Sequence, residues 1–107
     1  MKTEHSALTE SVYFILLAMV EPRHGYAVMQ YVEQLTNGRV VIGAGTLYGA
    51  VTSLLEKRWI RAVGSDSRKK EYETTELGKK ILHAEIARFH EMINLGTHII
   101  GRNGNEN

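Results

Sequence analysis

The sequence has no cysteine, a single proline and no long apolar run among its 107 residues. Without cysteine the chain can form neither a disulfide framework nor a thiolate metal site, and nothing indicates an oxidising compartment. The longest unbroken apolar run, residues 12–20, lies between two glutamates. A helix needs about 20 apolar residues to cross a bilayer. We therefore expect a soluble, cytoplasmic protein with no membrane partner.

The chain also lacks internal repeats and any linker long enough to separate independent domains. A chain of 107 residues supports one modest core, for which a partner subunit is a natural source of further burial. No serine, histidine and acid show the local pattern of a nucleophile elbow. The sequence therefore offers no support for catalysis, and we expect that the protein is not an enzyme.

Two patterns that suggest a metal or a nucleotide fail on closer reading. His83, His90 and His98 share one face of a predicted helix, but their spacing separates neighbours by roughly 10–12 Å, too far for one ion. Residues 43–48 open a helix like a dinucleotide-binding loop, yet Tyr48 stands where glycine or alanine should allow close helix–strand packing. We expect no metal and no cofactor.

Positive charge is concentrated in the middle of the chain. Residues 38–70 carry a net charge of +5, whereas residues 1–37 and 71–107 each carry −2. A local excess of lysine and arginine is the footprint expected of contact with phosphate groups.

Residues 43–59, inside this basic segment, form a predicted helix with two unlike faces. The apolar stripe consists of Leu47, Val51, Leu54 and Leu55, and the opposite side carries Thr46, Gly49, Thr52, Ser53, Glu56 and Lys57. A face of hydroxyls and glycine suits close approach to another surface, such as a DNA groove. Small polar residues also occur on ordinary surface helices, so the helix alone leaves both interpretations open.

The segments around this helix complete a mainly α architecture with a small β-hairpin. Residues 60–65 and 71–75 read as two strands joined by a polar loop, which predicts a winged helix-turn-helix. Before them we expect a helix from Thr9–Glu10 to about Glu21–Pro22 and a second from His24 to Asn37–Gly38. Residues 39–42 add a short strand or fill space. A last helix runs from Thr75 to about residue 100, ahead of a frayed tail.

Several residues are candidates for contact with DNA. The start of the second helix offers free amide hydrogens and a positive dipole end, so His24 and Tyr26 suit a phosphate there. A tyrosine packed in the core is the alternative. Hydroxyls suit base edges and cations suit phosphates. The full set of DNA-binding candidates is His24, Tyr26, Thr46, Tyr48, Gly49, Thr52, Ser53, Lys57, Arg68, Lys69 and Lys70.

The last helix is apolar over roughly half its circumference, more than one small domain can cover. This surplus predicts a homodimer whose interface includes Ile86, Phe89, Ile93 and Ile100. Phe89 and Met92 are also candidates for lining an effector pocket, although packing is the more frequent role of such residues. Glu85 and Arg88 lie in the same half and can pair with each other or across the dimer.

Six segments, taken in order, resemble the PadR family of transcriptional regulators. They are residues 8–10, 21–26, 45–48, 54–57, 68–72 and 75–78, and the His-Gly-Tyr and Thr-Leu-Tyr pieces are the most diagnostic. The resemblance implies a bacterial winged-helix repressor that binds operator DNA as a homodimer through one C-terminal helix. It also implies that Tyr26, Thr46 and Tyr48 contact DNA or set the recognition helix, that residues 68–70 form the basic wing, and that Phe89 lies near an effector pocket.

The sequence departs from the family pattern at Ala44, where proline is common, and at Arg58, where glycine is usual. We predict a winged-helix DNA-binding domain in residues 1–75 and a dimerisation helix and tail in residues 76–107. The partners are double-stranded palindromic operator DNA, a second copy of the chain and a small hydrophobic effector that relieves repression. The alternative is a winged-helix ligand-sensing or protein-interaction module with no operator of its own.

Overall fold

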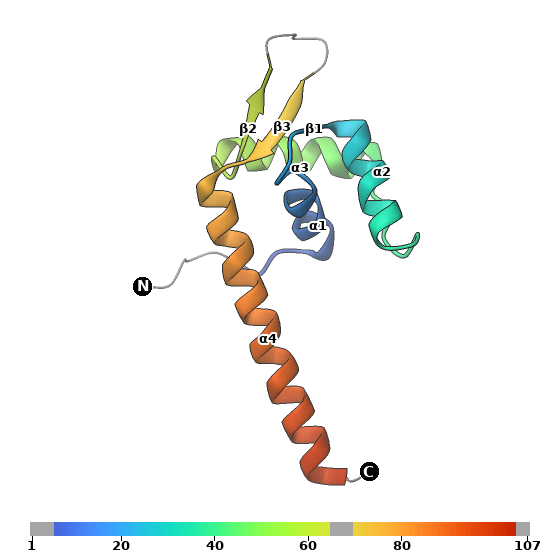
Figure 1. Cartoon of the computed structure of the whole chain (residues 1–107), viewed down its shortest axis with the longest axis vertical. Helices are drawn as coiled ribbons and strands as arrows, with labels where there is room; N and C mark the ends of the chain where they lie inside the picture. The colour runs from blue at the N-terminus through green and yellow to red at the C-terminus, as the bar shows by residue number, and fades with distance from the viewer. Residues whose placement is uncertain (1–5, 65–69, 105–107) are drawn as a thin grey trace.

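The computed structural model describes residues 6–64 and 70–104, with side chains up to Arg102. Its elements are α1 (Glu10–Ala18), β1 (Arg23–His24), α2 (Gly25–Leu35), α3 (Ala44–Glu56), β2 (Ile60–Val63), β3 (Glu71–Thr74) and α4 (Glu76–Gly104). Three helices and a small sheet make up a body, from which the β2–β3 hairpin and the C-terminal half of α4 extend in opposite directions (Figure 1). The predicted mainly α winged helix with a long C-terminal helix is confirmed.

Local signals in the sequence set most helix ends. Thr9 accepts a hydrogen bond from the Val12 amide at 3.1 Å, and Thr75 accepts one from the Gly78 amide at the same distance. Both predicted N-caps are therefore present. After α2 the chain turns through Asn37 and Gly38, whose φ angles of 52° and 81° lie in the left-handed region expected of this pair.

The predicted end of the first helix is wrong, because α1 stops at Ala18 rather than near Glu21–Pro22. Two contacts draw the chain out of the helix before the proline. The Arg23 guanidinium donates to the Ala18 carbonyl at 2.6 Å, and the Met19 carbonyl accepts from the Thr74 amide at 2.7 Å. At the other end of the chain, α4 runs past the predicted limit of about residue 100 to Gly104.

The sheet has three antiparallel strands in the order β1-β3-β2, rather than the two of the predicted hairpin. In the hairpin Ala62 pairs with Tyr72, and on the other edge of β3 His24 pairs with Glu71. Strand β1 was missed because two residues are too few to show alternation. His24 therefore lies in β1, and α2 begins one residue later, at Gly25. Residues 39–42 form no strand; their Val40 and Ile42 side chains fill the core instead.

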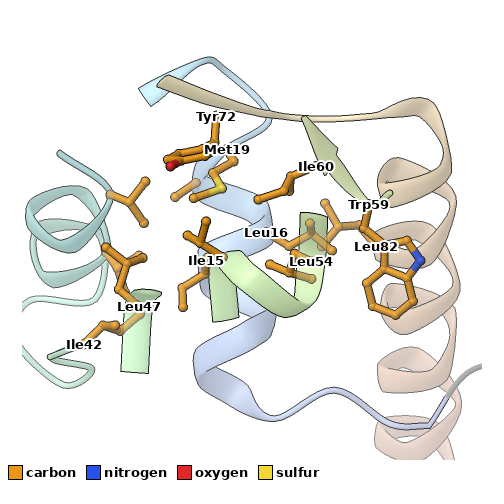
Figure 2. Close-up of a cluster of buried hydrophobic side chains, with 14 of the residues drawn as sticks. Ile15, Leu16, Met19, Ile42, Leu47, Leu54, Trp59, Ile60, Tyr72 and Leu82 are labelled. Carbon is orange, nitrogen blue, oxygen red and sulfur yellow. The ribbon is translucent and has the colours of Figure 1, made fainter. Parts of the chain in front are cut away.

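The core lies between α1, α2, α3, the sheet and the first turns of α4. Figure 2 shows α1 side chains such as Ile15 and Leu16 packed against Leu47 and Leu54 of α3. The predicted apolar stripe of α3 is correct at Leu47, Val51 and Leu54 and wrong at Leu55, which is 38% exposed. A helix turns about 100° per residue, so Leu55 lies past the edge of the buried stripe.

Helix α4 packs on the body along its first half, where Ile81, Leu82 and Glu85 are buried and Phe89 contacts Tyr13. Gly78 allows this approach, since a Cβ there would overlap the Trp59 carbonyl and the Thr74 methyl group. From residue 90 to residue 102 every side chain is exposed.

Candidate nucleic-acid interface

The outward side of α3 is lined by small side chains. Thr46, Gly49 and Thr52 are all exposed, and no atom lies within 4 Å of the position that a Cβ at Gly49 would take. The Thr52 hydroxyl donates to the Tyr48 carbonyl at 3.1 Å, which leaves its oxygen lone pairs facing outward. Nothing bulky therefore keeps another surface away from the middle of this helix.

Ser53 and Lys57 lie on one flank of that side. Both line a groove of about 550 Å³ between α3 and the segment that leads into α1. Lys57 is exposed, and its Nζ lies 4.8 Å from the centre of the Trp59 ring, whereas Ser53 is half-buried. Lys57 can reach a phosphate from this flank, but Ser53 is less accessible than Thr46 and Thr52.

The start of α2 lies directly beside the opposite flank of α3. Gly25 is buried there, and a Cβ on it would lie 2.7 Å from the Tyr48 hydroxyl oxygen. Tyr26 and Tyr48 are 66% and 50% exposed, so neither side chain is part of the core. The core alternative for Tyr26 is wrong, because its side chain stays at the surface.

The base of the hairpin also lies beside the start of α2. The His24 Nδ1 is 3.2 Å from the Lys70 carbonyl oxygen, and its Nε2 is 3.5 Å from a Glu71 carboxylate oxygen. Lys70 itself is exposed. Arg68 and Lys69, the other predicted wing cations, lie outside the described residues. The structure therefore joins α3 to the start of α2, and the start of α2 to the base of the wing.

Two cations counted in the basic segment are already paired within the chain. Arg61 donates to Glu73 at 2.7 Å across the hairpin, and Arg39 donates to Glu10 at 2.5 Å. The hydrogen bond with Glu10, helped by its charge, raises the pKa of Arg39. The net charge of residues 38–70 therefore overstates the positive charge that is free for an external partner.

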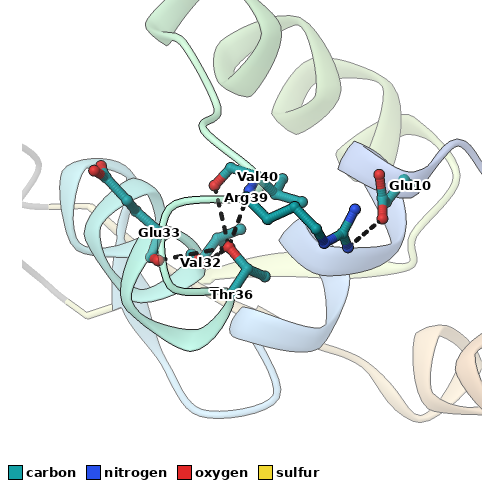
Figure 3. Close-up of polar contacts among 6 residues, drawn as sticks. All are labelled: Glu10, Val32, Glu33, Thr36, Arg39 and Val40. Atoms are coloured by element: carbon teal, nitrogen blue, oxygen red, sulfur yellow. Dashed lines mark hydrogen bonds and ion pairs between the residues drawn. The ribbon is translucent and has the colours of Figure 1, made fainter.

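The Arg39 pair belongs to a small network that holds the entry to α3 (Figure 3). Thr36 accepts from the Val40 amide at 3.0 Å and donates to the Val32 carbonyl at 2.9 Å. The network ties residues 36–40 to both α1 and α2, so the start of α3 is held in place from two sides.

Comparison with known proteins identifies the family. The sequence model of the transcriptional regulator PadR-like family matches residues 15–84. The chain belongs to the PadR-like family of transcriptional regulators. The part of the chain that the family model matches runs from α1 through the hairpin to the first turns of α4.

Solved PadR-like structures share this fold. A PadR family transcriptional regulator from Eggerthella lenta matches with a TM-score of 0.70 at 24% identity, covering 89% of this chain and 83% of that one. Bacillus subtilis PadR in complex with operator DNA matches with a TM-score of 0.58 at 23% identity, covering 69% of this chain and 45% of that one.

A sequence relative, an uncharacterised 37.1 kDa protein in a Streptomyces fradiae transposon, is 33% identical over 72 residues. The match covers 66% of this PadR-like chain, and the chain spans only 20% of that relative.

Helix α4 of this PadR-like chain exposes large apolar side chains from Ile86 to Ile100. Among the residues predicted for a dimer contact, Ile86, Ile93 and Ile100 are 36%, 60% and 74% exposed. Phe89 is half-buried, with its ring 5.1 Å from that of Tyr13 in an edge-to-face contact. Phe89 is thus partly used inside the protomer, whereas the three isoleucines are open to a partner.

Two polar contacts fix the helix just before that surface. Arg88 donates to both carboxylate oxygens of Glu85, at 2.7 and 3.1 Å, and the Leu8 amide donates to the same carboxylate at 3.3 Å. The predicted Glu85–Arg88 pair thus forms within one protomer, and the hydrogen bond with Glu85 raises the pKa of Arg88. The second effector candidate, Met92, is 49% exposed, and its sulfur lies 3.5 Å from an Arg88 nitrogen.

Within residues 6–64 and 70–104, no three histidine or acidic side chains come together in a way that could hold a metal ion. In the same part of the chain, no helix combines the length and apolar character needed to span a bilayer.

Proposed function

We propose that this chain is a sequence-specific DNA-binding repressor that acts as a homodimer. The observation that carries the proposal is the junction of three elements: Tyr48 of α3 lies against Gly25 of α2, and His24 contacts the base of the wing. A groove-reading helix, a helix N-terminus and a basic hairpin thereby adjoin one another. Family membership supports the proposal, as does the B. subtilis relative solved with operator DNA.

The side chains divide into two roles in this proposal. In the proposal Thr46 and Thr52 contact base edges in the major groove, with Ser53 contributing from the flank, and Gly49 lets the helix backbone approach closely. The remaining candidates contact the DNA backbone, where tyrosine hydroxyls and cations fix register without reading sequence. They are His24, Tyr26, Tyr48, Lys57 and Lys70 among the described residues, and Arg68 and Lys69 outside them.

The exposed isoleucines of α4 support a second copy of the chain as the partner. An apolar helix face of this length costs free energy when it stays in water, about 25 cal/mol for each Å². Pairing two copies through Ile86, Phe89, Ile93 and Ile100 would remove that cost. A twofold dimer would place two α3 helices in successive major grooves, so the operator should be a rough palindrome with half-sites about 34 Å apart.

A small hydrophobic effector that relieves repression completes the proposal. Met92 is exposed on the same face of α4, and Phe89 forms its boundary with the body. A ligand between the paired helices at this level would touch both the dimer contact and the aromatic pair that joins α4 to α1. It could therefore change the separation of the two α3 helices.

Selection of binding sites from a random duplex library, followed by fluorescence anisotropy on the enriched sequence, tests the proposal. Lys70→Gln should lower the slope of log K against log salt by about 0.9 for each lost phosphate contact. Thr52→Ala should instead relax base preference while leaving the salt slope unchanged. Lys80→Gln, an exposed α4 lysine, is the matched control and should behave like the wild type.

A library that yields no enriched sequence would contradict the proposal and favour a protein-interaction or ligand-sensing module. A salt slope that Lys70→Gln leaves unchanged would remove the base of the wing from the DNA interface.

A further inference from the structure

Thr75 connects the last helix to the turn that follows α3. It lies between the end of β3 and the start of α4, and its amide donates to the Trp59 carbonyl at 2.9 Å. Its hydroxyl donates to the Arg58 carbonyl at 2.7 Å and accepts from the Gly78 amide at 3.1 Å. One residue therefore caps α4 and also binds the two residues that follow the C-cap of α3.

The turn after α3 is in its own right fixed to α3. The Arg58 amide donates to the Leu55 carbonyl and the Trp59 amide to the Leu54 carbonyl, both at 3.0 Å. The Trp59 side chain is 9% exposed and belongs to the same core cluster as Leu82 of α4. A series of hydrogen bonds thus runs from the last turn of α3, through this turn, to the first turn of α4.

The start of α4 has little space in which to shift. A Cβ at Gly78 would overlap the Trp59 carbonyl oxygen and the Thr74 methyl group. The Thr74 amide and hydroxyl donate to the Met19 and Leu16 carbonyls at the end of α1, both at 2.7 Å. The start of α4 is therefore held against both α3 and α1. Residues 58–59, 74–75 and 78 together form the joint between α3 and α4.

We propose that Thr75 is a positioning residue that fixes the angle between α4 and α3, and thereby the spacing of the operator half-sites that the protein accepts. The inference rests on the proposed function, in which α4 pairs two copies of the chain and α3 reads the DNA. In such a dimer the distance between the two α3 helices depends on the two joints and on the paired α4 helices.

The length of α4 makes this angle important. Ile93 is among the exposed apolar residues of α4, and it lies about 18 residues after Thr75, or roughly 27 Å along a helix. A change of about 5° at the joint displaces a point roughly 27 Å away by about 2.4 Å, and opposite changes in two protomers add to about 5 Å. Successive base pairs are about 3.4 Å apart, so this displacement exceeds one base-pair step. The joint must therefore hold its angle within a few degrees to keep both α3 helices in register.

Aspartate at position 75 separates the two roles of the Thr75 side chain. Its carboxylate can cap α4 by accepting from the Gly78 amide, but it has no hydrogen to donate to the Arg58 carbonyl. Thr75→Ser keeps both contacts and should behave like the wild type. Thr9→Ala is the matched control, because it removes an N-cap bond of the same kind, to the Val12 amide, away from the joint.

The first experiment measures the separation of the two α3 helices without DNA. Because the chain has no cysteine, Glu56→Cys gives one exposed site on α3 for a nitroxide label, and double electron–electron resonance gives the distance distribution in the dimer. Thr75→Asp should broaden that distribution by about 5 Å, the displacement expected when the joint gains about 5° of freedom. Thr75→Ser and Thr9→Ala should keep the wild-type width. Equal widths in Thr75→Asp and the wild type would overturn the inference.

The second experiment measures spacing selectivity by fluorescence anisotropy. The selected half-site is placed twice as an inverted repeat, at the selected spacing and with the centres one base pair closer or farther apart. The measured quantity is the ratio of affinities for the selected and the altered spacing. Thr75→Asp should lower this ratio by about threefold, because a looser joint is less preorganised for one spacing. Thr75→Ser and Thr9→Ala should leave the ratio unchanged.

A ratio that Thr75→Asp leaves unchanged would show that Thr75 only caps α4. If Thr75→Asp does not fold, Thr75→Gly takes its place, since it removes the hydroxyl and glycine is tolerated at an N-cap. An absence of dipolar coupling in every labelled protein would contradict the proposed homodimer, and the inference with it. Failure of the wild type to bind any duplex would contradict DNA binding alone, and the distance measurement would still decide whether Thr75 fixes α3 against α4.

Discussion

Arg58 has a backbone conformation that arginine tolerates poorly, and replacing it should stabilise the protein. The residue follows α3 with φ of 62°, in the left-handed region that favours glycine. A side chain with a Cβ costs roughly 1–2 kcal/mol in that region. Glycine avoids this cost but loses more backbone entropy on folding, by about 0.5–1 kcal/mol. Arg58→Gly should therefore raise the free energy of unfolding by about 0.5–1 kcal/mol.

The assay is urea unfolding of three proteins, with thermal melts in parallel. For a domain of this size a gain of about 0.5–1 kcal/mol corresponds to roughly 2–6 °C in Tm. Arg58→Ala is the matched control, since it removes the same charge and long side chain but keeps the Cβ. The Arg58 carbonyl, which accepts from the Thr75 hydroxyl at 2.7 Å, is present in all three proteins. If Arg58→Gly is no more stable than Arg58→Ala, backbone strain at this position is not the explanation.

Two further predictions test the packing of α4. Gly78→Ala should destabilise the protein by about 2 kcal/mol or more in urea unfolding, because the new methyl group meets a backbone carbonyl that cannot move aside. Gly96→Ala, in the exposed part of the same helix with open space around it, should instead stabilise by about 0.5–1 kcal/mol, and equal effects would show that Gly78 is not a packing site. Ile100→Glu should shift sedimentation equilibrium toward monomers, whereas His98→Glu, which adds the same group on another side of the helix, should not. A dimer that survives Ile100→Glu would exclude this face as the contact.

The candidate interface could be predicted in part because its signals are local. The hydroxyl-lined side of α3 follows from helical spacing, and the exposure of Thr46, Gly49 and Thr52 agrees with it. Spacing did not distinguish Ser53, which lies on the flank beside the groove, from its neighbour Thr52. How accessible a flank of a helix is depends on the segment that packs beside it. The segment beside Ser53 comes from residues about 45 positions earlier in the chain.

The charge pattern shows the same limit. Sequence counts Arg39 and Arg61 as part of a basic segment, but both are paired with glutamates, one from α1 and one across the hairpin. Net charge in a window is a property of composition, whereas the charge presented to a partner depends on which ions lie within a few ångströms of one another. Only the folded chain brings Arg39 to Glu10.

The sequence by itself determined the winged-helix order, the N-caps at Thr9 and Thr75 and the left-handed turn at Asn37–Gly38, because each depends on neighbours within about four residues. Only the tertiary structure decided the early end of α1, the edge strand β1 and the contacts of His24 with the wing. Each of these needs a partner from β3, which lies more than 40 residues away in the chain. A backbone group can pair with a distant partner only once the core has brought the two together, so no local pattern indicates the pairing.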